Sequence, residues 1–178
     1  NTRGGQLYRC QMLGYQTYKD KYTKKNDDTL DLWVPGESTC NLTIPTGGKS
    51  IESNRIYFST DAKSTKIKGS DKTTLSFKIF ANNNKNKYVE YQYTVAGNEW
   101  MVDYNVNLVG VNDLVDPQYT EFSFNWMMNT PSQEREVSKE RETSNIYYSS
   151  MEGDVSQLKG GVKGNKEKKE VKYPLKWV

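Results

Sequence analysis

Three carboxylates at polar positions of expected β-strands are the first residues that could do chemistry. Glu90, Asp103 and Glu121 could act as the acid and base of a glycosidase, which needs two carboxyl groups about 5–10 Å apart. Nothing in the sequence brings these three side chains together, and a carboxylate on the wet face of a sheet ordinarily serves solubility. Glycosidase chemistry is therefore a weak interpretation of this pattern.

Composition limits the other chemistries. The 178-residue chain contains no histidine, which removes the commonest general base and the commonest zinc ligand. Asp27, Asp28 and Asp31 lack the regular oxygen-ligand spacing with a glycine hinge that calcium loops have. The net charge of +3 is too small to indicate a nucleic-acid partner. We therefore expect no enzyme activity, no cofactor and no metal.

Two further patterns stay open. Cys10 and Cys40 fit neither a metal-ligand spacing nor a redox pair, so they form either a disulfide or two buried free thiols on strands. The tripeptide Asn41-Leu42-Thr43 matches a glycosylation acceptor, although such a short pattern often occurs by chance.

A β-hairpin over residues 88–108 is the clearest structural element. Apolar and aromatic side chains alternate with polar ones on both sides of a turn at residues 96–99, where Gly97 and Asn98 can take a positive φ. One face should be buried and the opposite face, which carries Glu90 and Asp103, should be wet. The inward positions are Val89, Tyr91, Tyr93, Val95, Trp100, Val102, Tyr104, Val106 and Leu108.

The many aromatic side chains suggest an alternative function. The 13 Tyr, 5 Phe and 4 Trp could build either a thin aromatic core or a flat platform that stacks on sugars. The alternation favours the core for Tyr91, Tyr93, Tyr104, Trp100 and Trp126. The better surface candidates are Phe80, Tyr88, Trp33 and Trp177. A carbohydrate-binding β-sandwich of a secreted or surface protein is therefore the competing hypothesis.

The remaining segments favour an all-β fold with antiparallel sheets. Short strands separated by turn signals are predicted at residues 6–13, 30–34, 40–44, 55–59, 65–68, 74–81, 120–129, 145–149 and 175–178. Residues 132–142 could form one exposed helical turn or an irregular crossing. We expect a single domain over residues 1–178. With no apolar run of roughly 18–20 residues and no signal-peptide pattern, we expect a soluble segment, cut from something longer.

Four stretches of the sequence resemble one family. In order they read GGQLYRCQMLGYQTY, NRIYFST, YVEYQYTVAGNEWMVDYNVNLVG and FSFNWMMNTPSQEREVSKERETSNIYY. They resemble the large periplasmic domain of the membrane protein insertase YidC in its Bacteroidetes form. The strongest element follows Trp126 and consists of Pro131, Gln133, Glu134, Glu140, Arg141, Ile146, Tyr147 and Tyr148.

The resemblance implies a β-supersandwich similar to galactose mutarotases, placed on the periplasmic side of the bacterial inner membrane within a multi-pass protein. The implied role is non-catalytic assistance to insertion and folding of inner-membrane proteins, alone or with the Sec translocon. Mutarotase-like enzymes use histidine with a carboxylate, so this chain departs from the enzyme pattern. A strand before Gly4-Gly5 would be missing, and the last residues would lead toward a transmembrane segment that lies outside the chain.

The partners expected from this resemblance are the insertase's own transmembrane core, Sec components and nascent membrane proteins. Besides the groove of the sandwich, two surfaces could make the contacts: the charged segment at residues 133–141 and the basic, flexible stretch at about residues 159–172. Lysines beside a membrane are attracted to anionic lipids by about 1 kcal/mol each, although a solvated tether is the competing interpretation. The candidate contact residues are Gln133, Glu134, Arg135, Lys139, Glu140, Arg141, Lys166, Lys168 and Lys169.

Overall fold

The computed structural model describes residues 2–18, 29–118, 122–159 and 168–178. They form two compact units, which we describe separately. The first contains Asn1–Gln11 and Asp31–Thr130, and the second contains Met12–Leu30 and Pro131–Val178. The expectation of a single domain stays a prediction.

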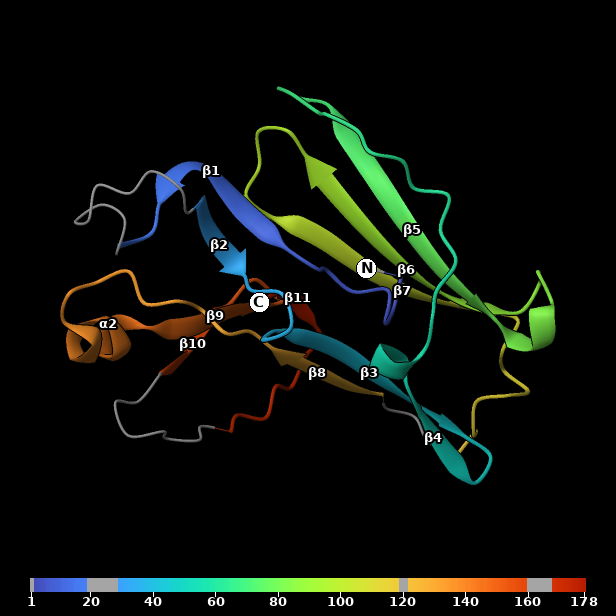
Figure 1. Ribbon diagram of the computed structural model, residues 1–178. Coiled ribbons are helices and arrows are strands. Elements are labelled where there is room, and N and C mark those ends of the chain that lie inside the picture. Colours follow the sequence, from blue (N-terminus) through green and yellow to red (C-terminus); the bar gives the residue numbers. More distant parts are fainter. Residues whose placement is uncertain (1, 19–28, 119–121, 160–167) are drawn as a thin grey trace. The chain divides into compact units, whose positions relative to one another are not determined.

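Antiparallel strands dominate both units (Figure 1). The strands are β1 (Cys10–Gln16), β2 (Thr29–Trp33), β3 (Thr39–Thr46), β4 (Lys49–Glu52), β5 (Lys72–Phe80), β6 (Tyr88–Ala96), β7 (Val102–Val109), β8 (Ser123–Met127), β9 (Asn145–Ser150), β10 (Val155–Lys159) and β11 (Leu175–Trp177). The helical segments are two short 3-10 turns, η1 (Ser53–Arg55) and η2 (Ala81–Asn83), and the helix α2 (Val137–Thr143). The predicted all-β, antiparallel fold class is confirmed.

The sheet β5-β6-β7 contains the predicted hairpin. Strands β6 and β7 pair with Tyr91 opposite Val106 and Tyr93 opposite Tyr104, and their connection at residues 97–101 is longer than the expected 96–99. Strand β5 adds to the other edge of β6, where Phe77 lies opposite Tyr91. Since side chains alternate along a strand, this register puts Phe77, Tyr91, Tyr93 and Tyr104 on one face.

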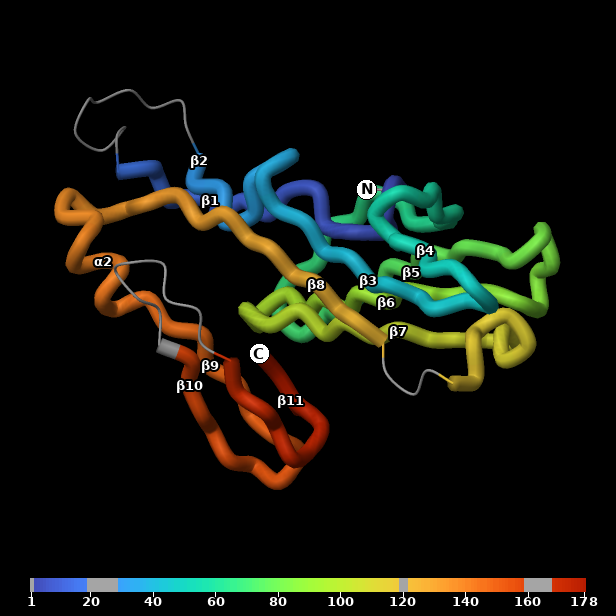
Figure 2. Tube along the Cα trace, turned by 90° about the horizontal axis from the view of Figure 1, so that it is seen from below, coloured from blue at the N-terminus to red at the C-terminus, as the bar shows by residue number. Residues whose placement is uncertain are grey.

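The second sheet of the first unit, β4-β3-β8, packs against that face as the other layer of a sandwich. Strand β8 runs alongside β3 although the two are far apart in the sequence (Figure 2), and Cys40 lies opposite Trp126. The core cluster unites Leu42 and Ile44 of β3 with Val89, Tyr91 and Tyr93 of β6 and with Phe58. The predicted sandwich is thus present within this unit.

Tyrosine rings fill the middle of this sandwich. Tyr91 is only 1% exposed, and its ring centroid lies 4.8 Å from that of Phe58 and 5.5 Å from that of Tyr104. Tyr104 also packs 4.9 Å from Tyr93 and 5.7 Å from Phe124 of the opposite sheet. Large rings at these separations make a thin core effective despite an apolar content of 34%.

Three tryptophan predictions need correction. Trp33, expected at the surface, is buried because it ends β2 and stacks at 6.3 Å on Trp126. Trp126, expected in the core, is half exposed on β8, which is an edge strand of its sheet. Trp100, also expected in the core, is 81% exposed, because β7 begins only at Val102 and the strand alternation does not reach it.

Strand prediction fails mainly in segments with little apolar alternation. The sequence missed β4 and β10. Residues 55–59 form no strand but an extended segment with isolated bridges from Tyr57 to Arg3 and from Ser59 to Lys78. Cys10, expected to be buried, is exposed, and it and the half-buried Cys40 are free thiols. Burial raises the pKa of the Cys40 thiol to about 11.

Gly5 gives a direct test of the packing around Tyr91. Its φ is +59°, and an added Cβ would lie 3.0 Å from Cδ2 of Tyr91 and 3.1 Å from Cγ of Phe58. Gly36 has a similar φ of +80°, but an added Cβ there meets no atom within 4 Å. We therefore expect Gly5→Ala to lower the free energy of unfolding by about 1–3 kcal/mol more than Gly36→Ala does. Equal losses in urea denaturation would contradict this packing.

The second unit contains the sheet β10-β9-β11 and the helix α2. Strand β10 pairs with β9 in regular register, with Gln157 opposite Tyr147. Strand β11 pairs with the other edge of β9, with a register shift between Leu175 and Trp177. Tyr148 in the central strand β9 is buried, while Ile146 and Tyr147 are about half exposed.

Candidate functional site

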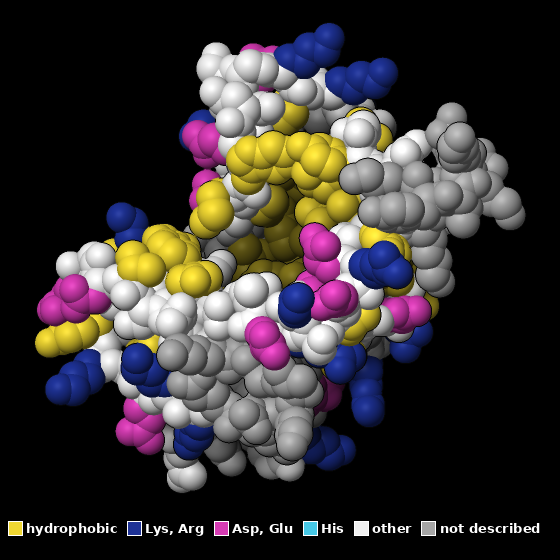
Figure 3. Space-filling model, turned by 90° about the vertical axis from the view of Figure 1, so that its left-hand side faces the viewer, with side chains coloured by type: hydrophobic (Ala, Val, Ile, Leu, Met, Phe, Trp, Pro, Cys, Tyr) yellow, Lys and Arg dark blue, Asp and Glu magenta, His cyan; other side chains and the backbone are white. Residues whose placement is uncertain are grey.

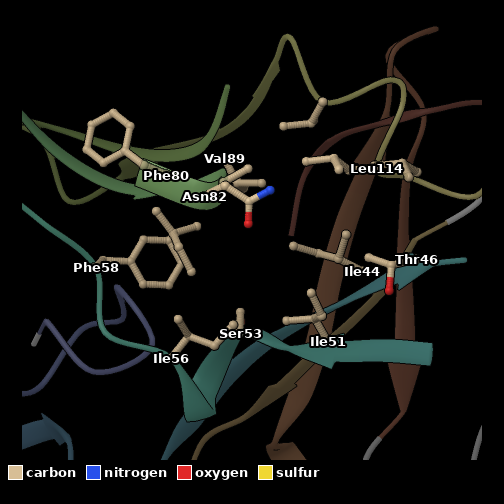
Figure 4. Close-up of a pocket in the computed structure, with 14 residues that line it drawn as sticks. Ile44, Thr46, Ile51, Ser53, Ile56, Phe58, Phe80, Asn82, Val89 and Leu114 are labelled. Atoms are coloured by element: carbon tan, nitrogen blue, oxygen red, sulfur yellow. The ribbon is translucent and has the colours of Figure 1, made fainter. Parts of the chain in front are cut away.

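An apolar cavity of about 360 Å³ lies in the first unit (Figure 4). Its walls come from separate segments of both sheets and from the loop after β7. The wall residues are almost all aliphatic or phenyl side chains, among them Ile44, Ile51, Phe58, Ile79, Val89 and Leu114. The volume is near the lower end of the range for ligand-binding pockets.

Local structure explains how the cavity forms. The loop after β7 turns back because the N–H groups of Leu114 and Val115 both donate to the carbonyl of Val111, at 2.9 and 3.0 Å. The N–H of Asp116 donates to the carbonyl of Pro45 at 3.2 Å, which ties this loop to β3. The polar atoms at the cavity belong to Thr46, Ser53 and Asn82. Figure 4 shows the amide of Asn82 directed toward the space between Phe58 and Ile44.

The second candidate site is a polar cluster around Glu90, on the other face of the sheet β5-β6-β7. Only 6% of Glu90 is exposed, although the sequence predicted a wet face there. Lys78 and Asn107 lie directly opposite Glu90 on the neighbouring strands. The Glu90 carboxylate accepts hydrogen bonds from the Ser76 hydroxyl at 2.5 Å and from the amides of Gln92 and Asn107 at 3.0 and 3.1 Å.

Electrostatics keep this carboxylate ionised. Desolvation raises the pKa of Glu90. The hydrogen bonds from Ser76, Asn107 and Gln92, together with the Lys78 ammonium 3.4 Å away, lower the pKa by more than desolvation raises it. The pKa of Glu90 therefore lies below its ordinary value. A satisfied, ionised carboxylate has no free lone pair directed at a substrate. The cluster therefore cross-links three strands.

The glycosidase interpretation finds no support in this geometry. Asp103 lies opposite Thr94, whereas Asn107 is the residue opposite Glu90. Because four residues separate Thr94 from Glu90 along β6, the two carboxylates are roughly 13 Å apart along the strand, beyond the spacing of a glycosidase pair. Glu121 lies outside the described residues.

Asp31, considered above as a calcium ligand, and Asn41, considered as a glycosylation acceptor, are both engaged in other contacts. Asp31 receives two hydrogen bonds of 2.8 Å from the guanidinium of Arg9, and the bond to Arg9 lowers the pKa of its carboxyl. Asp27 and Asp28 lie outside the described residues. Asn41 is 8% exposed, and its amide bonds to Glu52, Ser53 and Asn54. Within the described chain, no group of three or more acidic, cysteine or histidine side chains is placed to hold a metal ion.

The charged segment at residues 133–141 combines structural and free side chains. The Glu140 carboxylate accepts hydrogen bonds from the Gln133 N–H at 2.9 Å and from the Ser132 hydroxyl, and these bonds lower its pKa. Gln133 in turn accepts a bond of 2.9 Å from the N–H of Tyr18. Lys139 pairs with Glu136 at 2.9 Å. Glu140 and Gln133 therefore hold the loop before α2 in place.

The remaining contact candidates are exposed. Glu134, Arg135 and Arg141 make no side-chain hydrogen bond or ion pair with any described residue. Lys168 is exposed, and the ammonium of Lys169 lies 5.9 Å from the ring centre of Tyr148. Lys166 lies outside the described residues, as does most of the basic stretch, so its flexibility stays a prediction.

The sequence indicated Glu90 only as a possible catalytic carboxylate, without its hydrogen-bond partners, and of the cavity residues it indicated only Phe80, as a possible sugar-stacking residue. The cavity gathers side chains from distant segments, each of which reads as ordinary strand or loop. The Glu90 cluster depends on the exact hairpin register: a connection confined to residues 96–99 would pair Glu90 with Asn105, whereas the observed register pairs it with Asn107. A polar face with several amides beside one carboxylate is the signal that could have identified it.

Comparisons with known proteins give one consistent result. No protein-family model and no solved structure matches the chain. The membrane protein insertase YidC of Parabacteroides distasonis is 24% identical over 178 residues, which is 100% of this chain and 25% of the relative. YidC of Azobacteroides pseudotrichonymphae is 23% identical over 179 residues, with 100% of this chain and 26% of the relative covered. The chain resembles YidC from end to end.

This result confirms the resemblance to YidC found in the sequence motifs, and it does not favour the carbohydrate-binding alternative. The chain spans about a quarter of the length of these YidC relatives. Among the described residues, no helix has both the length and the apolarity to cross a membrane. Basic and acidic side chains are interspersed on the face drawn in Figure 3, in keeping with the small net charge.

Proposed function

We propose that this chain is a non-catalytic domain of a membrane protein insertase, on the periplasmic side of the bacterial inner membrane. It assists insertion and folding of inner-membrane proteins through protein–protein contacts. Its partners are the transmembrane core of the same insertase, components of the Sec translocon and nascent membrane proteins. The match to YidC over the whole chain carries the proposal.

The described chemistry supports a contact role over catalysis. The strongest carboxylate cluster, around Glu90, is fully engaged in hydrogen bonds within its sheet. The exposed charges without an ion-pair partner among the described residues gather instead around α2, where Glu134, Arg135 and Arg141 are exposed and Arg141 interacts only electrostatically with Glu140. Exposed charges of both signs on the braced loop before α2 and on α2 itself suit a specific and weak contact, since rim charges set partner choice and association rate.

The test uses the full-length insertase that carries this chain. The triple variant Glu134→Lys, Arg135→Glu and Arg141→Glu reverses these exposed charges and keeps the groups of Ser132 and Gln133 that donate hydrogen bonds to Glu140. We expect recovery of Sec components with the purified insertase to fall about tenfold, as like charges across an interface oppose the contact. Quantitative immunoblotting of the co-purified proteins measures this.

A matched control reverses the same number of charges elsewhere. Asp61→Lys, Lys63→Glu and Lys66→Glu changes one acidic and two basic residues in an exposed loop of the first unit. This variant should keep the recovery of the unaltered protein. Equal recovery for all three proteins would remove residues 133–141 from the interface, and an equal loss in both variants would show a non-specific charge effect.

The lysines at residues 168 and 169 belong to the proposal as a second contact, with the membrane surface. Each exposed lysine near an anionic leaflet is attracted by about 1 kcal/mol, and salt screens the attraction. The Lys169 ammonium contacts the Tyr148 ring, so Lys168 is the more available of the two lysines for the membrane surface.

A further inference from the structure

We propose that the apolar cavity of the first unit binds a fatty acid, with the aliphatic chain inside and the carboxylate at the mouth. This inference does not depend on the insertase proposal. It rests on the composition of the cavity walls, on the cavity volume and on the charges that flank the wall segments.

The walls select for an aliphatic chain. Ile44, Ile51, Ile79 and Leu114 supply branched methyl groups, and no charged side chain takes part in the lining. A volume of about 360 Å³ is small for a folded peptide segment and sufficient for one slender chain. Ile51 is still 38% exposed, so the apolar wall reaches the surface and a chain can enter without opening the sandwich.

Three exposed cations lie close in the sequence to wall residues and favour an acidic head group. Lys49, Arg55 and Lys85 lie within three residues of the wall residues Ile51, Ile56 and Asn82, and all three cations are exposed. None of them pairs with a described acidic residue. The nearby acids are engaged: Glu52 bonds to Asn41 and Thr43, and Asp113 pairs with Lys87 at 2.5 Å.

The side-chain amide of Asn82 can complete the head-group site. Asn82 is held with a φ of 51° and directs its amide toward the cavity (Figure 4), so its N–H₂ group can donate to a carboxylate. A head group held by one amide and by exposed cations gains from electrostatic attraction that salt weakens. Affinity should therefore fall with ionic strength.

The test is a titration of the chain with laurate, kept below its micelle-forming concentration, followed by methyl NMR. We expect saturable binding with shifts concentrated at Ile51, Ile79 and Leu114. Decanoate should bind about tenfold more weakly, as expected for two fewer buried methylenes. No saturable binding, or shifts centred on exposed residues such as Trp100, would overturn the proposal.

Two pairs of variants locate the site. Leu114→Asn puts an amide in the wall and should weaken laurate binding at least about tenfold, whereas Leu13→Asn, at an 83% exposed position, should not. If Leu114→Asn disturbs folding, Ala81→Leu fills the cavity instead, with Ala62→Leu as its exposed control. Unchanged affinity in folded Leu114→Asn or Ala81→Leu would contradict the site.

Head-group comparisons complete the test. Dodecylammonium should bind more weakly than laurate, and Arg55→Gln should weaken laurate binding several-fold and reduce its salt dependence. Equal binding of the two amphiphiles would overturn the assignment of an acidic head group. Displacement of laurate by a short leucine-rich peptide that binds the same methyl groups more tightly would assign the cavity to a polypeptide partner instead.

Discussion

Replacing Tyr91 with alanine is expected to lower the free energy of unfolding of the first unit by about 3–5 kcal/mol. The side chain is 1% exposed and its ring contacts Phe58 and Tyr104, so its loss leaves a cavity at the centre of the sandwich. Urea denaturation followed by circular dichroism measures the change. The matched control is Tyr57→Ala, at a 71% exposed tyrosine, which should cost less than about 0.5 kcal/mol.

The hydroxyl of the same residue gives a pH-dependent signature. The Tyr91 hydroxyl is buried and forms no well-aligned hydrogen bond with any described residue, so Tyr91→Phe should be near neutral at pH 7. Burial raises the pKa of Tyr91 to about 12, above the ordinary value of about 10. Because the folded state favours the neutral form of Tyr91, the stability that depends on its neutral hydroxyl is fully present below pH 10. It is lost as the pH rises from about 10 to about 12. Tyr91→Phe should lose less stability over this range than the unaltered chain, and identical losses would contradict the burial.

Replacing Glu90 with alanine is expected to lower the free energy of unfolding by about 2 kcal/mol. The change leaves Ser76, Gln92 and Asn107 without their acceptor. The contribution of the Lys78 ion pair is small because Lys78 is 36% exposed and screened by solvent. Asp103→Ala, on the same face, is the control and should change stability by less than about 0.5 kcal/mol.

Acid also tests the Glu90 cluster. The pKa of Glu90 lies below its ordinary value in the folded chain, so the carboxylate contributes stability at neutral pH. That contribution decreases once the pH falls below the ordinary value of 4.5 and is lost as the pH passes through the lowered pKa. Glu90→Gln should flatten this part of the stability profile. If stability falls equally steeply with pH in the Glu90→Gln variant and in the unaltered chain, the cluster does not stabilise the ionised form of Glu90.

The sequence predicted those parts of the fold that depend on strict alternation. The hairpin β6-β7 was accessible because every second side chain from Val89 to Val95 is apolar or aromatic, although its connection at residues 97–101 is longer than expected and has no positive φ at Gly97 or Asn98. Strand β10 was not, because its residues follow a glycine and lead into a lysine-rich stretch that reads as a loop. Trp126 was misplaced because the pairing of β3 with β8 makes β8 an edge strand, and Trp33 was misplaced because its stacking on Trp126 joins segments far apart in the sequence.

The candidate sites also differ in how far the sequence predicts them. The charged segment at residues 133–141 was named from its composition, but the bonds from Gln133 and Ser132 to Glu140 require the loop to fold back onto α2. The cavity requires Ile44, Ile79 and Leu114 to meet across two sheets and a loop. No local pattern encodes that meeting, because each residue satisfies an ordinary apolar position of its own segment.

Site-specific photo-cross-linking in cells tests the central proposal most directly. A photoreactive amino acid replaces Arg135 in the full-length insertase, and the same amino acid at Lys63 serves as the exposed control. A domain that contacts insertion partners should give protein adducts from position 135, identified by mass spectrometry as Sec components or nascent membrane proteins, and few from position 63. Adducts of equal yield and identity at both positions, or none from position 135 in an insertase that remains active, would contradict the proposal.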